Sequence, residues 1–179
     1  RQRQMCIRDS IYLMDEPLSS LDAKLREELR IELKKIQKDL NATILYVTHD
    51  HIEATTMADR IGVLKDGVLS QVGTPEEIYD NPNSIYVANR LGSPKINIFD
   101  LAKTKIPSKN KATHAGIRPE DISISNKGNY DVYIETVELL GAETVISFKS
   151  DNINGMILTQ TSDTFEEGKK IKIALNNKK

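Results

Sequence analysis

The sequence predicts an α/β fold in its first half, followed by a small all-β barrel or sandwich. Residues 11–57 alternate short, continuous apolar runs with helical patterns, in the order strand, helix, strand, helix. After Gly92 the apolar periodicity becomes alternating and the segments become short, which is typical of antiparallel strands. We place the boundary near Gly92 to Pro94 and expect two domains, residues 1–92 and 93–179.

The first predicted elements are two parallel strands joined by a helix. Residues 11–14 and 43–47 are short apolar runs, as expected of strands buried on both faces of a parallel sheet. Asn41 reads as the C-terminal stop of the helix between them, and a short helix follows over 52–57. The apolar face of the long helix recurs every three or four residues, at Leu21, Leu25, Leu29, Leu33, Ile36 and Leu40.

Turn and cap signals organise the chain up to Gly92. Lys65-Asp66-Gly67 predicts a tight hairpin between strands at 61–64 and 68–72, because Asp-Gly tolerates positive φ. Thr74-Pro75 reads as a helix start, and a second short helix is expected over 84–91. Beyond Gly92, alternating patterns predict strands at 131–135, 144–148, 156–160 and 171–175.

The composition excludes several classes of protein. The 39% hydrophobic and 28% charged content fits a globular chain, and the net charge of −1 with no Trp argues against a nucleic-acid partner. No apolar run reaches the ~20 residues of a membrane-spanning helix. Cys6 reads as a small buried hydrophobe in a reducing compartment. Arg1 to Ser10 are too polar for a signal peptide, so we expect the chain to begin inside a longer protein.

Polar residues at the ends of the two strands carry the predicted chemistry. Asp15, Glu16 and His49 should share the sheet edge at which α/β proteins bind ligands. Asp15, at the tip of its strand, suits Mg²⁺ held through water, because that ion keeps most of its hydration shell. Glu16 should point the other way along the pleat and polarise a water, while His49 could contact a terminal phosphate. Two acids and one His suit nucleotide hydrolysis.

Each of these signals has a structural alternative when it is taken alone. Asp15 and Glu16 could belong to an ordinary loop after a strand, and His49 could cap or pack at a strand end. The run from Ser19 to Asp22 could be only a capping box at a helix start. His51 and His114 fit solvent-facing or structural roles better than catalytic ones.

The set of motifs resembles a known family. Residues 11–26, IYLMDEPLSSLDAKLR, followed by YVTHD at 46–50, resemble the Walker B strand, D-loop and H-loop of ABC-transporter ATPase subunits. QVGTPEEIY at 71–79, then Asn81-Pro82 and Gly92-Ser93-Pro94, are similar to the subgroup that energises import of sugars and glycerol phosphates. GIRPEDI at 116–122 resembles the hallmark of the OB-type regulatory domain of that subgroup, called TOBE. The resemblance covers residues 11–175.

The resemblance implies a fold and a set of roles. The fold would be the C-terminal part of a P-loop NTPase domain with parallel strands, followed by a small OB-like barrel. ATP and Mg²⁺ would be the cofactors: Asp15 would hold Mg²⁺ through water, Glu16 would be the base for the attacking water, and His49 would sense the γ-phosphate. Ser19 and Asp22 in the D-loop would face a second ATPase subunit across the bound nucleotide.

The implied partners and location follow from the same subgroup. The subunit would act as a dimer at the cytoplasmic face of the cell membrane, with transmembrane permease subunits and, indirectly, an extracellular solute-binding protein. A regulatory protein could bind the OB-like domain, which could instead only buttress the dimer. Importers of polyamine, iron or sulfate remain alternatives for the cargo, and a chromosome-maintenance or repair ATPase is an alternative class that would usually continue into coiled coil.

The sequence departs from the family pattern in several places. A P-loop requires Gly, four residues and then Gly-Lys-Ser/Thr, but Gly168-Lys169 is followed by Lys170 and has no such upstream Gly. The Leu-Ser-Gly-Gly-Gln signature and the Q-loop are absent as well. Residues 1–10 do not continue the family pattern and suggest a non-native junction, and the regulatory domain stops early. We therefore expect a C-terminal portion of a longer subunit, without ATPase activity alone.

Overall fold

The structure, a computed structural model, describes residues 11–104, 106, 112–160 and 164–175 of the chain. The predictions for Cys6 and for residues 1–10 lie outside the described residues. The chain divides into two compact units, Arg1–Asn81 and Pro82–Lys179. Among the described residues, no helix combines the length and the apolar character that crossing a membrane requires.

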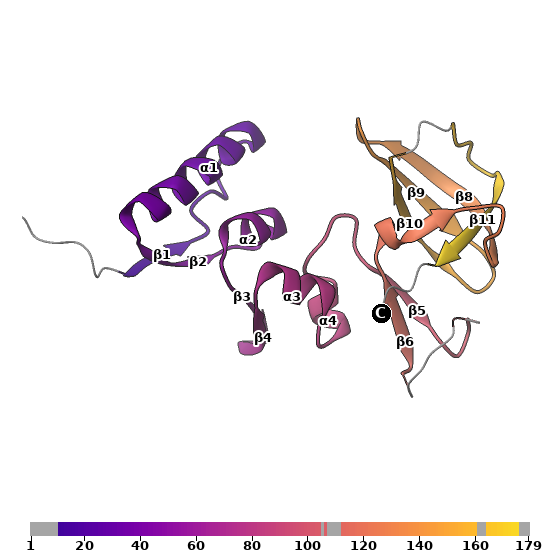
Figure 1. Cartoon of the computed structure of the whole chain (residues 1–179), viewed down its shortest axis with the longest axis horizontal. Coiled ribbons are helices and arrows are strands. Elements are labelled where there is room, and N and C mark those ends of the chain that lie inside the picture. The colour runs from indigo at the N-terminus through magenta and orange to yellow at the C-terminus, as the bar shows by residue number, and fades with distance from the viewer. Residues whose placement is uncertain (1–10, 105, 107–111, 161–163, 176–179) are drawn as a thin grey trace, which may run out of the picture. The chain divides into compact units, whose positions relative to one another are not determined.

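The first unit alternates strands and helices in the predicted order (Figure 1). Its elements are β1 (Ile11–Asp15), α1 (Ala23–Leu40), β2 (Thr43–Val47), α2 (His51–Met57), β3 (Ile61–Lys65), β4 (Val68–Gly73) and α3 (Pro75–Asp80).

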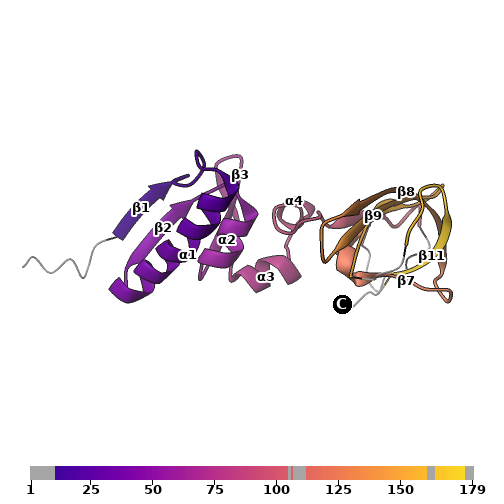
Figure 2. The same cartoon turned by 90° about the horizontal axis from the view of Figure 1, so that it is seen from above.

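The pair formed by β1 and β2 is parallel and in register, with Leu13 opposite Leu45. Figures 1 and 2 show α1 along one face of this pair, where Tyr12, Met14 and their partners on β2 are half-buried. Leu13, on the other face, is 75% exposed. The prediction of burial on both faces is therefore wrong for this structure, because α1 covers one face and no described residue covers Leu13 and Leu45 to the same degree.

Local capping explains where the helices begin and end. Asp22 caps α1 by accepting a hydrogen bond from the backbone N–H of Leu25, and Asn41 ends the helix with φ of 50°. Thr74 and Glu77 form a reciprocal capping box at the start of α3. The predicted helix stop at Asn41 and the predicted helix start at Thr74 are confirmed, whereas the cap of α1 at Asp22 was not predicted.

The turn between β3 and β4 is the predicted tight hairpin. Asp66 and Gly67 have φ of 50° and 77°, so two successive residues are left-handed, as a type I′ turn requires. This geometry matches the right-handed twist of the paired strands, which is why Asp-Gly carries the signal.

The second unit is rich in β-strands. Its largest sheet has five antiparallel strands in the order β10-β9-β8-β11-β7 and is nearly closed into a barrel, consistent with an OB-like domain (Figures 1 and 2). The elements are α4 (Ile85–Ala88), β5 (Asn97–Asp100), β6 (His114–Ile117), the 3₁₀ turn η1 (Pro119–Asp121), β7 (Ile122–Ile124), β8 (Tyr130–Leu139), β9 (Thr144–Lys149), β10 (Asn154–Thr159) and β11 (Lys170–Leu175).

Several elements of this unit differ from the sequence-based expectation. The strands β5, β6 and β7 have only three or four residues each and carry too short a pattern to be predicted. The helix expected over 84–91 is limited to α4, because Asn89 takes the C-cap position and donates its side-chain amide to the carbonyl of Ile85.

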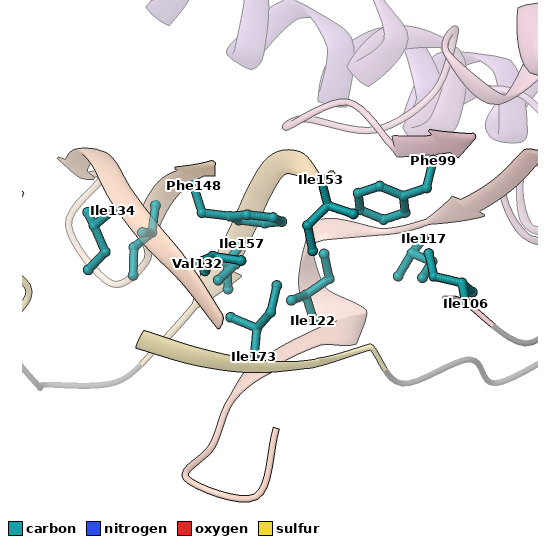
Figure 3. Packing of buried hydrophobic residues seen from close by; sticks show 11 residues of the cluster. Phe99, Ile106, Ile117, Ile122, Val132, Ile134, Phe148, Ile153, Ile157 and Ile173 are labelled. Atoms are coloured by element: carbon teal, nitrogen blue, oxygen red, sulfur yellow. The ribbon is translucent and has the colours of Figure 1, made fainter. Parts of the chain in front are cut away.

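One continuous hydrophobic cluster fills the β-rich unit (Figure 3). Phe148 lies fully buried within it, and isoleucine and valine side chains from β7, β8, β9, β10 and β11 belong to the same cluster. The buried members are Phe99, Ile106, Ile117, Ile122, Val132, Ile134, Ile146, Phe148, Ile153, Ile157 and Ile173.

A buried arginine attaches the segment around Gly92 to the β-rich unit. Arg118 lies just after β6, and its Nη1 donates to the carbonyl of Leu91 at 2.7 Å and to that of Ala88 at 3.3 Å. This contact helps to place α4 in the second structural unit. The domain boundary at residues 92–94 concerns family architecture and stays a prediction.

We predict that Phe148→Ala destabilises the β-rich unit by about 3 to 5 kcal/mol, because it leaves a cavity in a closed core. Urea unfolding followed by nuclear magnetic resonance (NMR) signals of the barrel methyl groups measures this change. Tyr133→Ala is the matched control, since Tyr133 is 54% exposed on β8 and its loss should cost under about 1 kcal/mol. Equal effects of the two variants would contradict the core assignment.

Candidate functional site

The edge at which β1 and β2 end forms the candidate site. Asp15 lies opposite Val47 in the parallel register, and the backbone N–H of Glu16 donates to the carbonyl of Val47 at 2.8 Å. Because the carboxyl ends of parallel strands lie at the same edge of the sheet, the loops that follow β1 and β2 start side by side.

The structure brings Glu16 and His49 into direct contact. Glu16 Oε1 lies 2.9 Å from His49 Nδ1, and both side chains are accessible, at 44% and 75% exposure. Glu16 reaches this position through a left-handed backbone with φ of 44°. The sequence analysis expected the Glu16 side chain to point along the strand pleat. In the structure its direction is set by this left-handed turn instead. A non-glycine residue held in that region costs about 1 to 3 kcal/mol and is common at functional sites.

The contact fixes the protonation pattern of the imidazole. A carboxylate oxygen accepts hydrogen bonds, so His49 Nδ1 donates and the neutral ring leaves Nε2 as an acceptor. The hydrogen bond that His49 donates to Glu16, followed by the negative charge of that carboxylate, raises the pKa of His49 above its ordinary value. The site thus holds an imidazole with a raised pKa in hydrogen-bond contact with a carboxylate at the same sheet edge.

The loop after Glu16 is held by one buried side chain and one hydroxyl. Leu18 is 4% exposed within an otherwise open loop, and Ser19 Oγ donates to the carbonyl of Glu16 at 2.9 Å. Ser19 is therefore not the cap of α1; Asp22 has that position, so the capping-box interpretation of Ser19 is wrong. Both Ser19 and Asp22 are exposed.

Asp15 lies on the open face of the β1–β2 pair, next to the Glu16–His49 contact in sequence. Across the part of the chain that the structure describes, no group of three or more His, Cys, Asp or Glu side chains gathers to hold a metal ion. A single exposed carboxylate fits an ion such as Mg²⁺, which keeps its waters and takes further ligands from phosphate oxygens.

Directly after His49, the start of α2 contains residues that the sequence analysis did not single out. Asp50 Oδ1 accepts from the backbone N–H of Ile52 at 2.7 Å and of Glu53 at 3.2 Å, and Arg26 lies 3.6 Å from the same carboxylate. Burial would raise the pKa of Asp50, but these hydrogen bonds together with His51 and Arg26 outweigh it, so the pKa is lowered. An Asp before a helix is a capping signal that could have identified this residue. Of the other two histidines, His51 begins α2 and His114 lies exposed in the second unit.

We predict that the midpoint of the His49 titration in this chain lies above the ordinary value of about 6.5. Because the pKa is raised in the folded state, the pair stabilises the fold below the ordinary value, and that contribution disappears as the pH rises through the raised pKa. NMR titration of the imidazole protons measures the midpoint.

In Glu16→Gln the midpoint should fall, whereas Glu32→Gln, an exposed change in the middle of α1, should leave it in place. An unchanged midpoint in Glu16→Gln would show that the contact does not hold in solution.

Comparisons with known proteins identify relatives of this architecture. No family model matches the chain. The chain is 46% identical over 149 residues to the sn-glycerol-3-phosphate import ATP-binding protein UgpC of Brucella abortus, covering 75% of the chain and 42% of that protein. It is 34% identical over 208 aligned residues to the trehalose/maltose import ATP-binding protein MalK of Thermococcus litoralis, covering 99% of the chain and 56% of the relative.

A third relative extends the range of named cargoes. The chain is 39% identical over 181 residues to the xylose/arabinose import ATP-binding protein XacK of Haloferax volcanii, which covers 87% of the chain and 47% of that protein. The chain spans about half the length of the curated relatives it matches.

Proposed function

Because the chain belongs to the family of import ATP-binding subunits of ABC transporters, we propose that it contributes the water-activating half of an ATPase site. The whole subunit would couple ATP hydrolysis to uptake of a carbohydrate or a glycerol phosphate. The relatives that carry glycerol-phosphate, maltose and pentose names support this class of cargo. The single observation that supports the chemistry most is the 2.9 Å contact between Glu16 and His49.

Glu16 is the residue proposed to receive the proton of the attacking water. Its side chain is accessible, and it stands at the carboxyl edge of a parallel strand pair, where α/β proteins bind ligands. While His49 Nδ1 donates to Oε1, the second carboxylate oxygen remains available to accept from a water. General base catalysis of this kind accelerates proton transfer steps by about 100- to 10,000-fold.

His49 is proposed to orient the terminal phosphate and that water. With Nδ1 engaged by Glu16, the opposite nitrogen, Nε2, faces away from the pair and can contact a phosphate oxygen or the water. The raised pKa favours the cationic ring, which donates from both nitrogens and suits an anionic phosphate. Asp15 would hold Mg²⁺ through water, and the ion would neutralise charge that develops on the phosphates.

The remaining partners follow from the same proposal. Ser19 and Asp22 stand exposed in the loop between β1 and α1 and would face a second ATP-binding subunit. Transmembrane permease subunits would hold the pair at the cytoplasmic face of the cell membrane, with a solute-binding protein as an indirect partner. Closure of the two subunits on ATP would then change the permease conformation.

The β-rich unit supports a second role, as a regulatory module. Its hydrophobic cluster is drawn from its own strands and connecting segments, so it can hold its shape as a separate binding module. We propose that a regulatory protein or small ligand binds residues 93–179. Titration of the subunit with candidate sugars, phosphates and regulatory proteins separates this role from simple support of the dimer, which predicts no binding.

We predict that Glu16→Gln in the full-length subunit lowers kcat for ATP hydrolysis by about 100-fold or more, because the amide cannot take the proton. The KM for ATP should change little, since Gln keeps the size and an oxygen of Glu. Glu32→Gln, exposed on α1, is the matched control and should keep full activity. Activity retained in Glu16→Gln would reject Glu16 as the base.

We also predict that residues 1–179 alone hydrolyse ATP at a negligible rate. The sequence contains no Gly-x₄-Gly-Lys-Ser/Thr loop to bind the phosphates. Without that loop, Asp15 and Glu16 alone would bind the nucleotide weakly. A phosphate-release assay on the purified chain checks this. Robust hydrolysis that Glu16→Gln abolishes would contradict it, while leaving the role of Glu16 in place.

A further inference from the structure

Glu53 is the one charged side chain that the structure buries among the described residues of the first unit. It lies on α2 and is 3% exposed. Its Oε2 accepts hydrogen bonds from the hydroxyl of Tyr46 at 2.9 Å and from Thr48 Oγ1 at 2.8 Å. Because a buried carboxylate without partners is costly, this arrangement needs both hydroxyl donors in place.

The two donors lie where β2 leads into His49. Tyr46 is the penultimate residue of β2, and Thr48 immediately precedes the histidine. Burial, followed by the Glu53 carboxylate, raises the pKa of Tyr46, so its hydroxyl keeps the proton that it donates. Glu53 thus binds the end of the strand to the helix that follows.

Thr48 extends this network to the far side of His49. Its Oγ1, besides donating to Glu53, accepts from the backbone N–H of Asp50 at 3.0 Å. Asp50 is in turn the cap of α2 and accepts from the N–H of Glu53. Both neighbours of His49 are therefore held to the first turn of α2, and the histidine lies between two fixed positions.

His49 depends on this backbone for its direction. Its side chain is 75% exposed and carries no packing around most of its ring, while its Nδ1 must meet Glu16 Oε1 at 2.9 Å. A small rotation of the peptide between Thr48 and Asp50 would carry the imidazole away from the carboxylate. Misplacement of a reacting group by about 1 Å can lower a rate by about 100-fold.

We propose that Glu53 is a positioning residue for His49: by accepting from Tyr46 and Thr48, it fixes the turn that points the imidazole at Glu16. The inference rests on the proposed function for the catalytic part of this claim, since His49 matters to hydrolysis only if it contacts the phosphate or the water. Glu53 itself is buried and touches neither.

The test separates positioning from simple stabilisation by reading the imidazole itself. The ¹⁵N chemical shifts of the His49 ring in this chain report which nitrogen carries the proton when the ring is neutral. The wild-type chain and Glu53→Gln, which keeps an acceptor oxygen, should show the Nδ1–H form. Glu53→Leu, of similar volume without an acceptor, should lose this signal and show the Nε2–H form that free imidazole prefers.

A second pair of variants covers the case in which Glu53→Leu does not fold. Thr48→Val removes the hydroxyl beside His49, and Thr48→Ser keeps it, so only the Val variant should lose the Nδ1–H form. The Nδ1–H form retained in a folded Glu53→Leu chain, or in Thr48→Val when Glu53→Leu is unfolded, would overturn the proposal.

Activity of the full-length subunit supplies the second readout. Glu53→Leu should lower kcat by about 100-fold with little change in KM for ATP, and Glu53→Gln should restore most of it. An unchanged kcat in a variant that has lost the Nδ1–H form would overturn the catalytic part of the proposal.

The two proposals fail in different ways. If the wild-type subunit does not hydrolyse ATP, the proposed function fails, while the ring shifts still test the effect of Glu53 on His49. If the wild-type chain lacks the Nδ1–H form, the Glu16–His49 contact is absent and Glu53 has nothing to position.

Discussion

The in-register parallel pairing of β1 and β2 is the constraint on which the candidate site depends. It sets Asp15 opposite Val47 and lets the N–H of Glu16 bond to the Val47 carbonyl, so two loops distant in sequence start at one edge. A slip of β1 by one residue against β2 would turn Leu13 to the face of α1 and move Glu16 away from His49. The chemistry proposed for Glu16 and His49 therefore requires the correct register of β1 against β2.

Local signals were sufficient to predict most elements of the first unit. The four-residue recurrence of leucine and the left-handed stop at Asn41 define α1, and Asp66-Gly67 defines the hairpin, because each acts through its immediate neighbours. The proximity of Glu16 and His49 also followed from the sequence, since parallel strands end at one edge. Their catalytic roles stay proposals that rest on family resemblance and on this geometry.

The features that the sequence did not predict depend on contacts between distant segments. Glu16 takes its left-handed conformation where its backbone N–H donates to the carbonyl of Val47 on the neighbouring strand. Glu53 looks like an ordinary helix acid until the structure brings Tyr46 and Thr48 to it. The prediction that β1 and β2 are buried on both faces was wrong, because an apolar run indicates that a strand favours burial but does not say which segment covers each face.

The account is tested most directly by a crystal structure of the full-length subunit with Mg²⁺ and a non-hydrolysable ATP analogue. It predicts that Glu16 and His49 keep their contact while His49 Nε2 lies within hydrogen-bond distance of the terminal phosphate or of the water beside it. A structure in which the nucleotide binds away from this strand edge, or in which the imidazole turns from both Glu16 and the phosphate, would contradict it.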